Sequence, residues 1–124
     1  IPIMICSEIL KENEPFKHSW DVTSDSIAAY IASLLNAKIL IATNVNGIYT
    51  REPSEEGSKF IDKIDAKKLL TFEESSIDLM LPSLLIEFGT NCYVVNGMYP
   101  ERVLSLIDDN INDYNFDYTQ IIGE

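Results

Sequence analysis

The chain has 124 residues, 46% of them hydrophobic, which is typical of one globular domain with its own core and not of a disordered segment. Twenty acidic and nine basic residues give a formal net charge of −11. That charge argues against nucleic acid and against an anionic membrane surface as partners, because both need clustered Lys and Arg. It does not exclude a nucleotide, since backbone N–H groups, a helix dipole and a metal ion can hold one with few basic side chains.

Targeting and thiol features indicate a reducing compartment. No apolar stretch approaches the roughly 20 residues that span a bilayer, and no basic segment precedes an apolar one, so we expect no membrane span and no secretory signal. Cys6 and Cys92 lie in apolar surroundings without metal-ligand spacing, and His18 is the only histidine. We expect buried free thiols and a cytoplasmic location. The chain starts at Ile1, within an apparent strand, so we expect it to be a piece of a longer protein.

The first predicted elements are a strand and a helix. Residues 3–6 predict a core strand. The helix follows a polar loop, with Thr23 or Ser24 as N-cap and Asp25 in its first turn. Its apolar residues recur at helical spacing as far as Asn36.

The next stretch alternates strands and loops. Residues 39–42 form a continuous β-type run, as expected for a strand buried on both faces of a parallel sheet. Residues 46–47, Asn-Gly, predict a tight hairpin turn, and residues 48–50 a short extended piece. Residues 51–58 are rich in Pro, Gly, Ser and Glu and predict a loop. Residues 60–64 alternate apolar and charged side chains, which favours an edge strand.

A short helix and a longer helical pattern come next. Asp65 is expected to cap a helix over residues 66–70. Residues 72–88 carry a helical apolar stripe, in which Pro82 either kinks the helix or marks its true first turn. Gly89 is expected to end this helix.

The last part repeats the same alternation. Residues 92–95 predict a buried strand, residues 100–107 a helix opened by proline, and residues 118–122 a final strand that could be antiparallel. Strands that alternate with helices indicate an α/β domain with a mostly parallel sheet.

Asp25 is the first candidate functional residue. A carboxylate in the first turn of a helix often serves only the helix dipole and the cap. It can also face a phosphate-bearing pocket and orient a lysine or a magnesium ion during phosphoryl transfer. Asp21 and Asp25 together could act as an acid/base pair, although their place at the helix start favours capping or metal binding. The local residues do not decide between these roles.

The second candidate is the polar turn at residues 43–47. It is either an ordinary turn or a nucleotide loop, with Thr43 and Asn44 donating to phosphate and Gly47 letting the backbone approach closely. Tyr49 could stack on a purine or cover the sheet edge. Neither a GxxxxGK[ST] loop nor a GxGxxG loop is present, so motifs exclude a P-loop NTPase and a dinucleotide-binding Rossmann domain.

Three runs resemble the carboxyl-terminal half of the amino acid kinase superfamily: TSDSIAAYIA at 23–32, ILIATNVNGIYTREP at 39–53 and VVNG at 94–97. The sequence of residues 18–32 is most similar to that of an archaeal branch of the superfamily, which acts in methanofuran biosynthesis. This resemblance implies a three-layer αβα fold and an ATP- and Mg²⁺-dependent kinase with a small phosphorylated acceptor, a phosphorylated furan in that branch. It also implies a homo-oligomer, and that residues 1–124 are the nucleotide-binding half, without the amino-terminal acceptor-binding half.

The resemblance also assigns roles to residues. Asp25 stands where the family organises its catalytic lysines, and Thr23 and Ser24 stand where substrate is contacted. No metal-ligating residue is assigned. The positions that correspond to the ATP contacts are Thr43, Asn44, Tyr49 and Pro53, to which the turn adds Gly47.

The chain departs from the family pattern at several positions. Asn44, Asn46 and Glu52 stand where Asp is common, and Ser83 stands where many relatives carry a catalytic lysine. A non-catalytic ATP-sensing domain therefore stays open as an alternative, as does a uridylate or isopentenyl phosphate kinase.

Overall fold

The computed structural model describes residues 3, 11, 22–72, 75–108 and 115–124. Residues 4–6 of the expected first strand, which include Cys6, lie outside the described residues, and so do His18 and Asp21. The helices are α2 (Ser24–Leu35), α3 (Ala66–Leu69), α4 (Leu81–Phe88) and α5 (Pro100–Ile107), and the strands are β1 (Ile39–Thr43), β2 (Ile48–Tyr49), β3 (Phe60–Ile61), β4 (Lys63–Asp65), β5 (Cys92–Asn96) and β6 (Thr119–Ile122).

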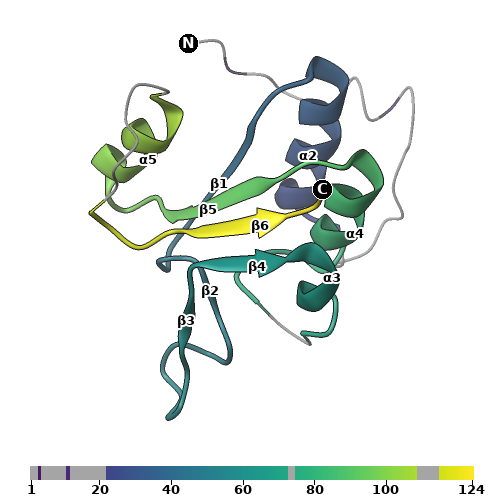
Figure 1. Ribbon diagram of the computed structural model, residues 1–124. Helices are drawn as coiled ribbons and strands as arrows, with labels where there is room; N and C mark the ends of the chain where they lie inside the picture. Colours follow the sequence, from purple (N-terminus) through teal and green to yellow (C-terminus); the bar gives the residue numbers. More distant parts are fainter. Residues whose placement is uncertain (1–2, 4–10, 12–21, 73–74, 109–114) are drawn as a thin grey trace.

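Four strands form the main sheet, in the order β1-β5-β6-β4. β1 pairs in parallel with β5, Ile39 opposite Cys92, and β4 pairs in parallel with β6. The last strand, β6, lies between β5 and β4 (Figure 1). It runs antiparallel to β5. The predicted α/β class with a mostly parallel sheet flanked by helices is confirmed, and so is the antiparallel final strand.

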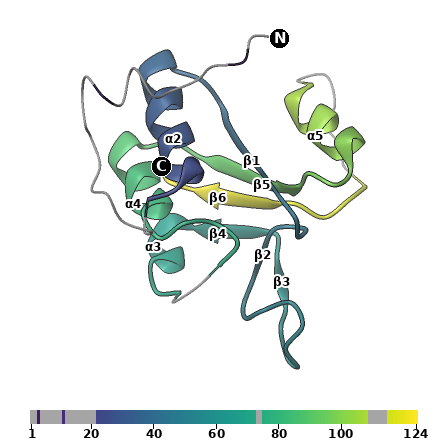
Figure 2. The same cartoon turned by 180° about the vertical axis from the view of Figure 1, so that it is seen from behind.

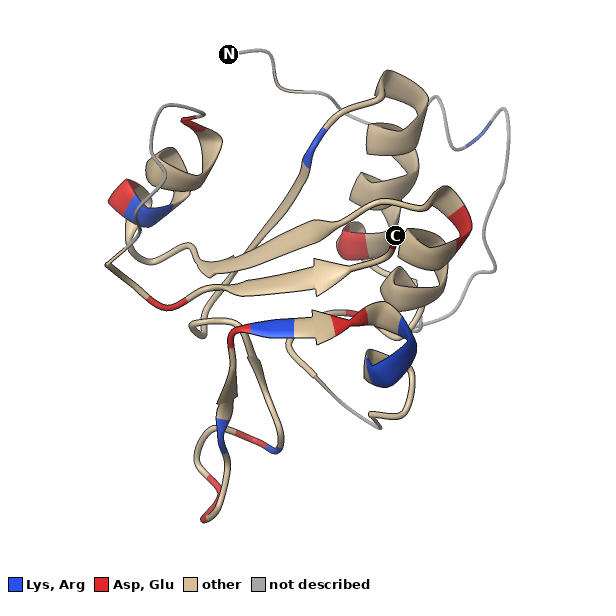
Figure 3. Ribbon diagram, viewed as in Figure 1, with Lys and Arg blue, Asp and Glu red and all other residues tan. Residues whose placement is uncertain are grey.

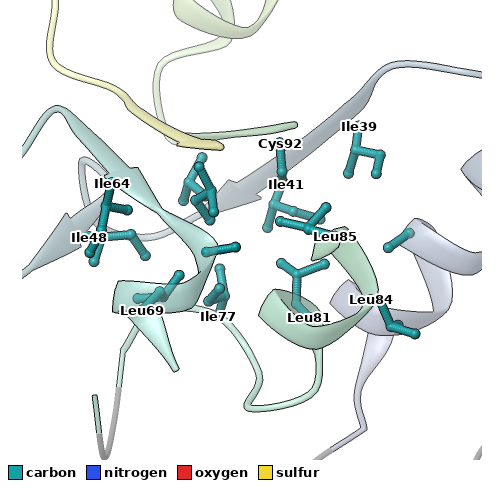
Figure 4. Close-up of a cluster of buried hydrophobic side chains, with 14 residues drawn as sticks. Ile39, Ile41, Ile48, Ile64, Leu69, Ile77, Leu81, Leu84, Leu85 and Cys92 are labelled. Atoms are coloured by element: carbon teal, nitrogen blue, oxygen red, sulfur yellow. The ribbon is translucent and has the colours of Figure 1, made fainter. Parts of the chain in front are cut away.

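The helices α2, α4 and α3 lie together, and α5 lies apart from them in both views of the chain (Figures 1 and 2). The core forms where α4 meets the strands. Figure 4 shows Ile41 and Cys92 pointing toward Leu85 of α4, which is fully buried. Along β1 the buried residues Ile39 and Ile41 alternate with more exposed ones, whereas in β5 Val95 and Asn96 are buried as well as Cys92 and Val94.

Helix ends follow their local sequence closely. Asn36 closes α2 in the left-handed conformation, with φ of 51°. Asp65 caps α3, its carboxylate accepting from the N–H of Lys67 at 2.8 Å. Pro82 lies in the first turn of α4 and does not kink a longer helix, and Gly89 ends that helix at φ of 61°.

Two predictions about the middle of the chain are wrong. Residues 46–47 are not a hairpin turn, because β2 pairs antiparallel with β3 and the intervening residues 50–59 make the connection. Residues 60–64 are not one strand, because β3 pairs with β2 whereas β4 joins the main sheet beside β6. The break falls at Asp62, whose carbonyl accepts a hydrogen bond from Gln120 at 2.9 Å. Tertiary pairing therefore divides a segment that its local alternation presents as one strand.

Candidate active site

The amino-terminal end of α2 is capped by a carboxylate from a distant part of the chain. Thr23 is the N-cap residue, but within the described structure its own side chain makes no capping hydrogen bond. Instead the carboxylate of Asp78 accepts hydrogen bonds from the backbone N–H groups of Thr23 at 2.8 Å and Ser26 at 3.0 Å. These N–H groups have no partner within the helix, so Asp78 completes the cap.

Asp78 connects the starts of two helices. The hydroxyl groups of Thr23 at 2.9 Å and Ser26 at 2.5 Å donate to the same carboxylate, and so does the N–H of Leu81 in α4 at 2.8 Å. The side chain is only 9% exposed. Five hydrogen bonds and the positive ends of two helix dipoles offset the cost of burying this charge.

Asp25 contacts the same segment from the first turn of α2. Its Oδ2 accepts a hydrogen bond from the backbone N–H of Asp78 at 3.0 Å, and its side chain is half-buried. Burial raises the pKa of Asp25 above its ordinary value; the N–H of Asp78 acts against that rise, and the negative charge of Asp78 adds to it. A nearby cation would stabilise the charged form of such a carboxylate. Phosphoryl-transfer sites need cations of this kind to neutralise the phosphates.

A cavity of about 590 Å³ lies next to the polar turn that follows β1. Its volume is within the usual range for small-molecule sites. The structure brings four predicted nucleotide contacts, Asn44, Gly47, Tyr49 and Pro53, to this one cavity. The full lining consists of Asn44, Val45, Gly47, Tyr49, Thr50, Arg51, Glu52, Pro53, Glu55, Ser75 and Ser76.

Residues 75–78 connect the cavity to the start of α2. Ser75 and Ser76 line the cavity, and the hydroxyl of Ser76 donates to the carbonyl of Gly47 at 2.9 Å. Two residues further along the chain, the N–H of Asp78 holds Asp25. Because two residues span at most about 7 Å, the wall of the cavity and the Asp25 carboxylate belong to neighbouring parts of the molecule.

The other predicted site residues lie at the edge of the cavity or at the start of α2. Thr43 is not among the cavity-lining residues; its carbonyl accepts from the N–H of Gly97 at 2.8 Å, which ties β1 to the end of β5. Thr23 is half-buried and its hydroxyl donates to Asp78. Ser24 is exposed at the helix start.

Charge is distributed unevenly around the cavity. Figure 3 shows charged residues at helix ends, on β4 and in the hairpin loop, whereas β1, β5 and β6 carry none. The cavity itself carries Arg51 against Glu52 and Glu55. Within residues 22–72, 75–108 and 115–124, no group of three or more His, Cys, Asp or Glu residues could hold a metal ion, and no helix is long and apolar enough to cross a bilayer.

Gly47 has a packing role in addition to its place in the cavity wall. A Cβ atom on Gly47 would lie 2.2 Å from Oγ1 of Thr119 and 3.1 Å from the ring of Phe60. The same Thr119 hydroxyl accepts from the N–H of Ile48 at 2.9 Å and donates to the carbonyl of Ile61 at 2.6 Å. β6 therefore anchors the hairpin that carries much of the cavity, and only glycine fits at the point of contact.

A polar cluster that was not predicted joins the ends of β1 and β5. The side-chain oxygen of Asn46 accepts from Asn96 at 3.2 Å and from the guanidinium of Arg102 at 3.0 Å. Arg102 also stacks over the ring of Tyr99, 4.1 Å from its centroid. The cluster fixes the turn after β1 against the start of α5.

Sequence reasoning missed Asp78 and Ser76. The only signal for Asp78 is a single acid within the apolar run of residues 77–81, and nothing marks Ser76. Apart from the N–H of Leu81, which also binds Asp78, their partners lie at least 29 residues away, so no local pattern contains the information.

Comparison with known proteins identifies the class. The model of the amino acid kinase family matches residues 2–96, so the chain belongs to that family. It is 40% identical, over 99% of its length, to the [5-(aminomethyl)furan-3-yl]methyl phosphate kinase of Methanocaldococcus jannaschii, covering 53% of that protein. It is 34% identical to the uridylate kinase of the same organism over 101 residues, 73% of this chain and 44% of that one. The chain thus spans about half the length of the curated relatives that it matches.

Solved structures agree with this assignment. The UMP kinase of Ureaplasma parvum superposes with a TM-score of 0.67 at 26% identity, over 82% of this chain and 42% of that one. An isopentenyl phosphate kinase substrate complex superposes with a TM-score of 0.54 at 24% identity, over 80% of this chain and 40% of that one, and supports the fold alone. The resemblance inferred from the sequence motifs is confirmed.

Proposed function

We propose that the whole protein is an ATP-dependent kinase that transfers a phosphoryl group to a small phosphorylated acceptor. The observation that supports this most is the half-buried carboxylate of Asp25, held by a segment that also lines the cavity beside the polar turn. Phosphoryl transfer needs positioning and charge neutralisation more than covalent chemistry, and these two groups provide for both. Family membership supports ATP as the donor.

The acceptor that we propose is [5-(aminomethyl)furan-3-yl]methyl phosphate. Its support is the 40% identity to the kinase that carries this name, over almost the whole of this chain. Uridylate is an alternative acceptor, since uridylate kinases are among the relatives. Isopentenyl phosphate is a second alternative, left open by the resemblance of the sequence motifs. We further propose that residues 1–124 form the nucleotide-binding half and that the acceptor-binding half belongs to a part of the protein outside this chain.

The residues take the following roles in this proposal. Asn44, Gly47, Tyr49 and Pro53 hold the nucleotide in the cavity, with Thr43 at its margin. Tyr49 offers a ring face for the base, since its other contact is edge-on to Phe60 at 5.4 Å between centroids. We expect the hairpin loop to close on the nucleotide from one side and residues 75–76 from the other.

The start of α2 handles the reacting groups in the same proposal. Thr23 and Ser24 contact the acceptor there, and Asp25 orients the groups that neutralise the transferring phosphoryl. Ser24 is exposed and its hydroxyl is accessible to a ligand, whereas the Thr23 hydroxyl keeps only its acceptor lone pairs for one.

A magnesium ion fits Asp25 better than it fits Asp78. The carboxylate of Asp78 already accepts five hydrogen bonds, whereas within the described residues only Oδ2 of Asp25 has a partner. Asp25 therefore has an oxygen ligand to offer a hard cation, whose remaining ligands would come from phosphate and water. When bound, Mg²⁺ would neutralise charge on the ATP phosphates.

A cytoplasmic location and a homo-oligomeric state complete the proposal. The free thiol of Cys92 is fully buried, which accords with a reducing compartment. The oligomeric state is proposed from the family resemblance and is measurable by light scattering on the full-length protein.

One observation favours a second function, an ATP-sensing domain without catalysis. Ser83, at the position where many relatives carry a lysine, is exposed on α4. A site without this cation would bind ATP and leave the transition-state charge uncompensated unless another lysine supplies it.

The test is a kinase assay on the full-length protein with γ-labelled ATP and Mg²⁺. Label transfer to the furan phosphate, faster than to uridylate or isopentenyl phosphate, would support the proposal. ATP binding by calorimetry without transfer to any of the three acceptors would overturn it in favour of the sensing domain. Transfer to uridylate alone would keep the kinase and replace the acceptor.

A further inference from the structure

Asp78 is a buried carboxylate to which the proposed reaction assigns no role. Its two oxygens accept all the hydrogen bonds that reach it: Oδ2 from both groups of Thr23 and the N–H of Ser26, and Oδ1 from the Ser26 hydroxyl and the N–H of Leu81. Donors come from two helices, so the carboxylate cannot rotate without breaking several bonds. The backbone of Asp78 is fixed as a result.

The fixed backbone then holds a second carboxylate. The N–H of Asp78 donates to Oδ2 of Asp25 at 3.0 Å, which leaves Oδ1 of Asp25 to face other groups. The orientation of Asp25 thus depends on a residue 53 positions away. A neutral Ser or Asn can cap a helix equally well, so a cap alone does not require a buried negative charge beside Asp25.

We propose that Asp78 is a positioning residue for phosphoryl transfer, because its fixed backbone N–H sets the orientation of Asp25. The proposal rests on the kinase function proposed above. Asp78 touches neither substrate nor nucleotide in it and acts only through Asp25. It also locks the first turn of α4, the helix that packs against α2, so the two helix starts move as one body.

The first experiment is a double-mutant cycle on the full-length kinase with Asp25→Asn, Asp78→Asn and both. We expect Asp78→Asn to lower kcat at least about tenfold with KM for ATP within about twofold, and to have no further effect in the Asp25→Asn background. Ser33→Ala is the control, because it removes a hydrogen-bonding hydroxyl from α2, the helix of Asp25; that hydroxyl donates to the carbonyl of Tyr30. Additive losses in the cycle, or equal losses with Ser33→Ala, would overturn the proposal.

If Asp78→Asn does not fold, Ser26→Ala replaces it in the cycle. This variant keeps the charge of Asp78 and removes one of the five hydrogen bonds that its carboxylate accepts. We expect kcat to fall about two- to fivefold when Asp25 is present and to stay unchanged in the Asp25→Asn variant. Loss of the same size in both backgrounds would show a merely structural role.

A second measurement separates this proposal from the kinase function. The ¹³C-carboxyl chemical shift of Asp25 in the full-length protein, assigned from Asp25→Asn, should differ between Asp78→Asn and the wild type at one fixed pH, because the N–H that holds Asp25 is displaced. A wild type without transferase activity would end the kinase proposal and leave this comparison intact. An unchanged chemical shift of Asp25 would overturn the role of Asp78 whatever the activity.

Discussion

The two halves of the candidate site are built in opposite ways. At the start of α2, short side chains are wholly or partly buried and bonded to one another, and their partners lie more than 50 residues apart in the sequence. Around the cavity, residues 50–57 are exposed and belong to one hairpin loop, which projects away from the sheet (Figure 1). The difference indicates that the group proposed for chemistry is preorganised, whereas the proposed nucleotide site is lined largely by an exposed loop that can adjust.

The largest effect should come from Asp25→Asn. We expect turnover in the full-length protein to fall by roughly 10²–10³-fold, because the charge that orients the reacting groups is lost. The melting temperature should stay the same or rise, since Asn still accepts from Asp78 and a half-buried charge disappears. Calorimetry and steady-state kinetics measure both.

Asp62→Asn is the matched control for that substitution, because Asp62 is exposed between β3 and β4. Turnover that falls equally in both variants, or survives in Asp25→Asn, would remove the distinction between the preorganised region and the rest.

The second effect concerns the support of the adjustable region. Gly47→Ala should destabilise the protein by about 2–3 kcal/mol, because its methyl group would collide with Thr119. Gly89→Ala meets open space and should cost roughly 1 kcal/mol, for the left-handed backbone alone. Urea unfolding of the full-length variants compares them. Equal costs would mean that the hairpin is not anchored at Gly47.

The third effect tests whether the cavity holds the base. Tyr49→Ala should raise KM for ATP about tenfold, the loss of one base-stacking contact, with kcat within about twofold and the melting temperature little changed. Tyr49→Phe keeps the ring and should behave like the wild type. A fall in kcat with KM unchanged would mean that Tyr49 acts in the chemical step and does not bind the base. The functional distinction between the cavity and the start of α2 would then be wrong.

The smallest effect is a pH dependence in the core. Because the pKa of Cys92 is about 12 in the folded state and near 9.0 when unfolded, the unfolded chain loses this proton first, and stability falls as pH rises above the unfolded value. Between about pH 8 and about pH 9.5 the loss should be ~0.8 kcal/mol. Cys92→Ala should show a shallower pH slope in chemical unfolding. Identical slopes in the wild type and in Cys92→Ala would mean that folding does not hinder deprotonation of the Cys92 thiol.

Local sequence patterns were sufficient where the cause is local. Asp65 capping α3, Pro82 opening α4 and Gly89 ending it all depend on the residue and its immediate neighbours. These features were readable because backbone dihedral preferences and caps act within one turn. Of the positions that the family motifs assign to ATP, Asn44, Tyr49 and Pro53 line the cavity, whereas Thr43 does not, and their role in binding stays a prediction.

The rest depended on contacts between distant segments. The alternation of residues 60–64 describes one strand, yet β2 and β6 each pair with a part of it. Asp78 looks like an interruption of an apolar run until α2 is placed beside it. In both cases the structure of the segment is determined by a partner far away in the sequence. That partner can be identified only once the sheet and the helices have been assembled.

The position of β6 also has a consequence for how the molecule forms. β4 and β5 do not pair with each other; both pair with β6, which leaves the ribosome after them. Among the described strands, β5 can therefore pair with β1 before β6 is synthesised, whereas β4 pairs only once β6 is present. Residues 119–122 act as the closing piece, and they bring the Thr119 hydroxyl that anchors the hairpin. The cavity beside that hairpin should thus form only after residues 119–122 have joined the sheet.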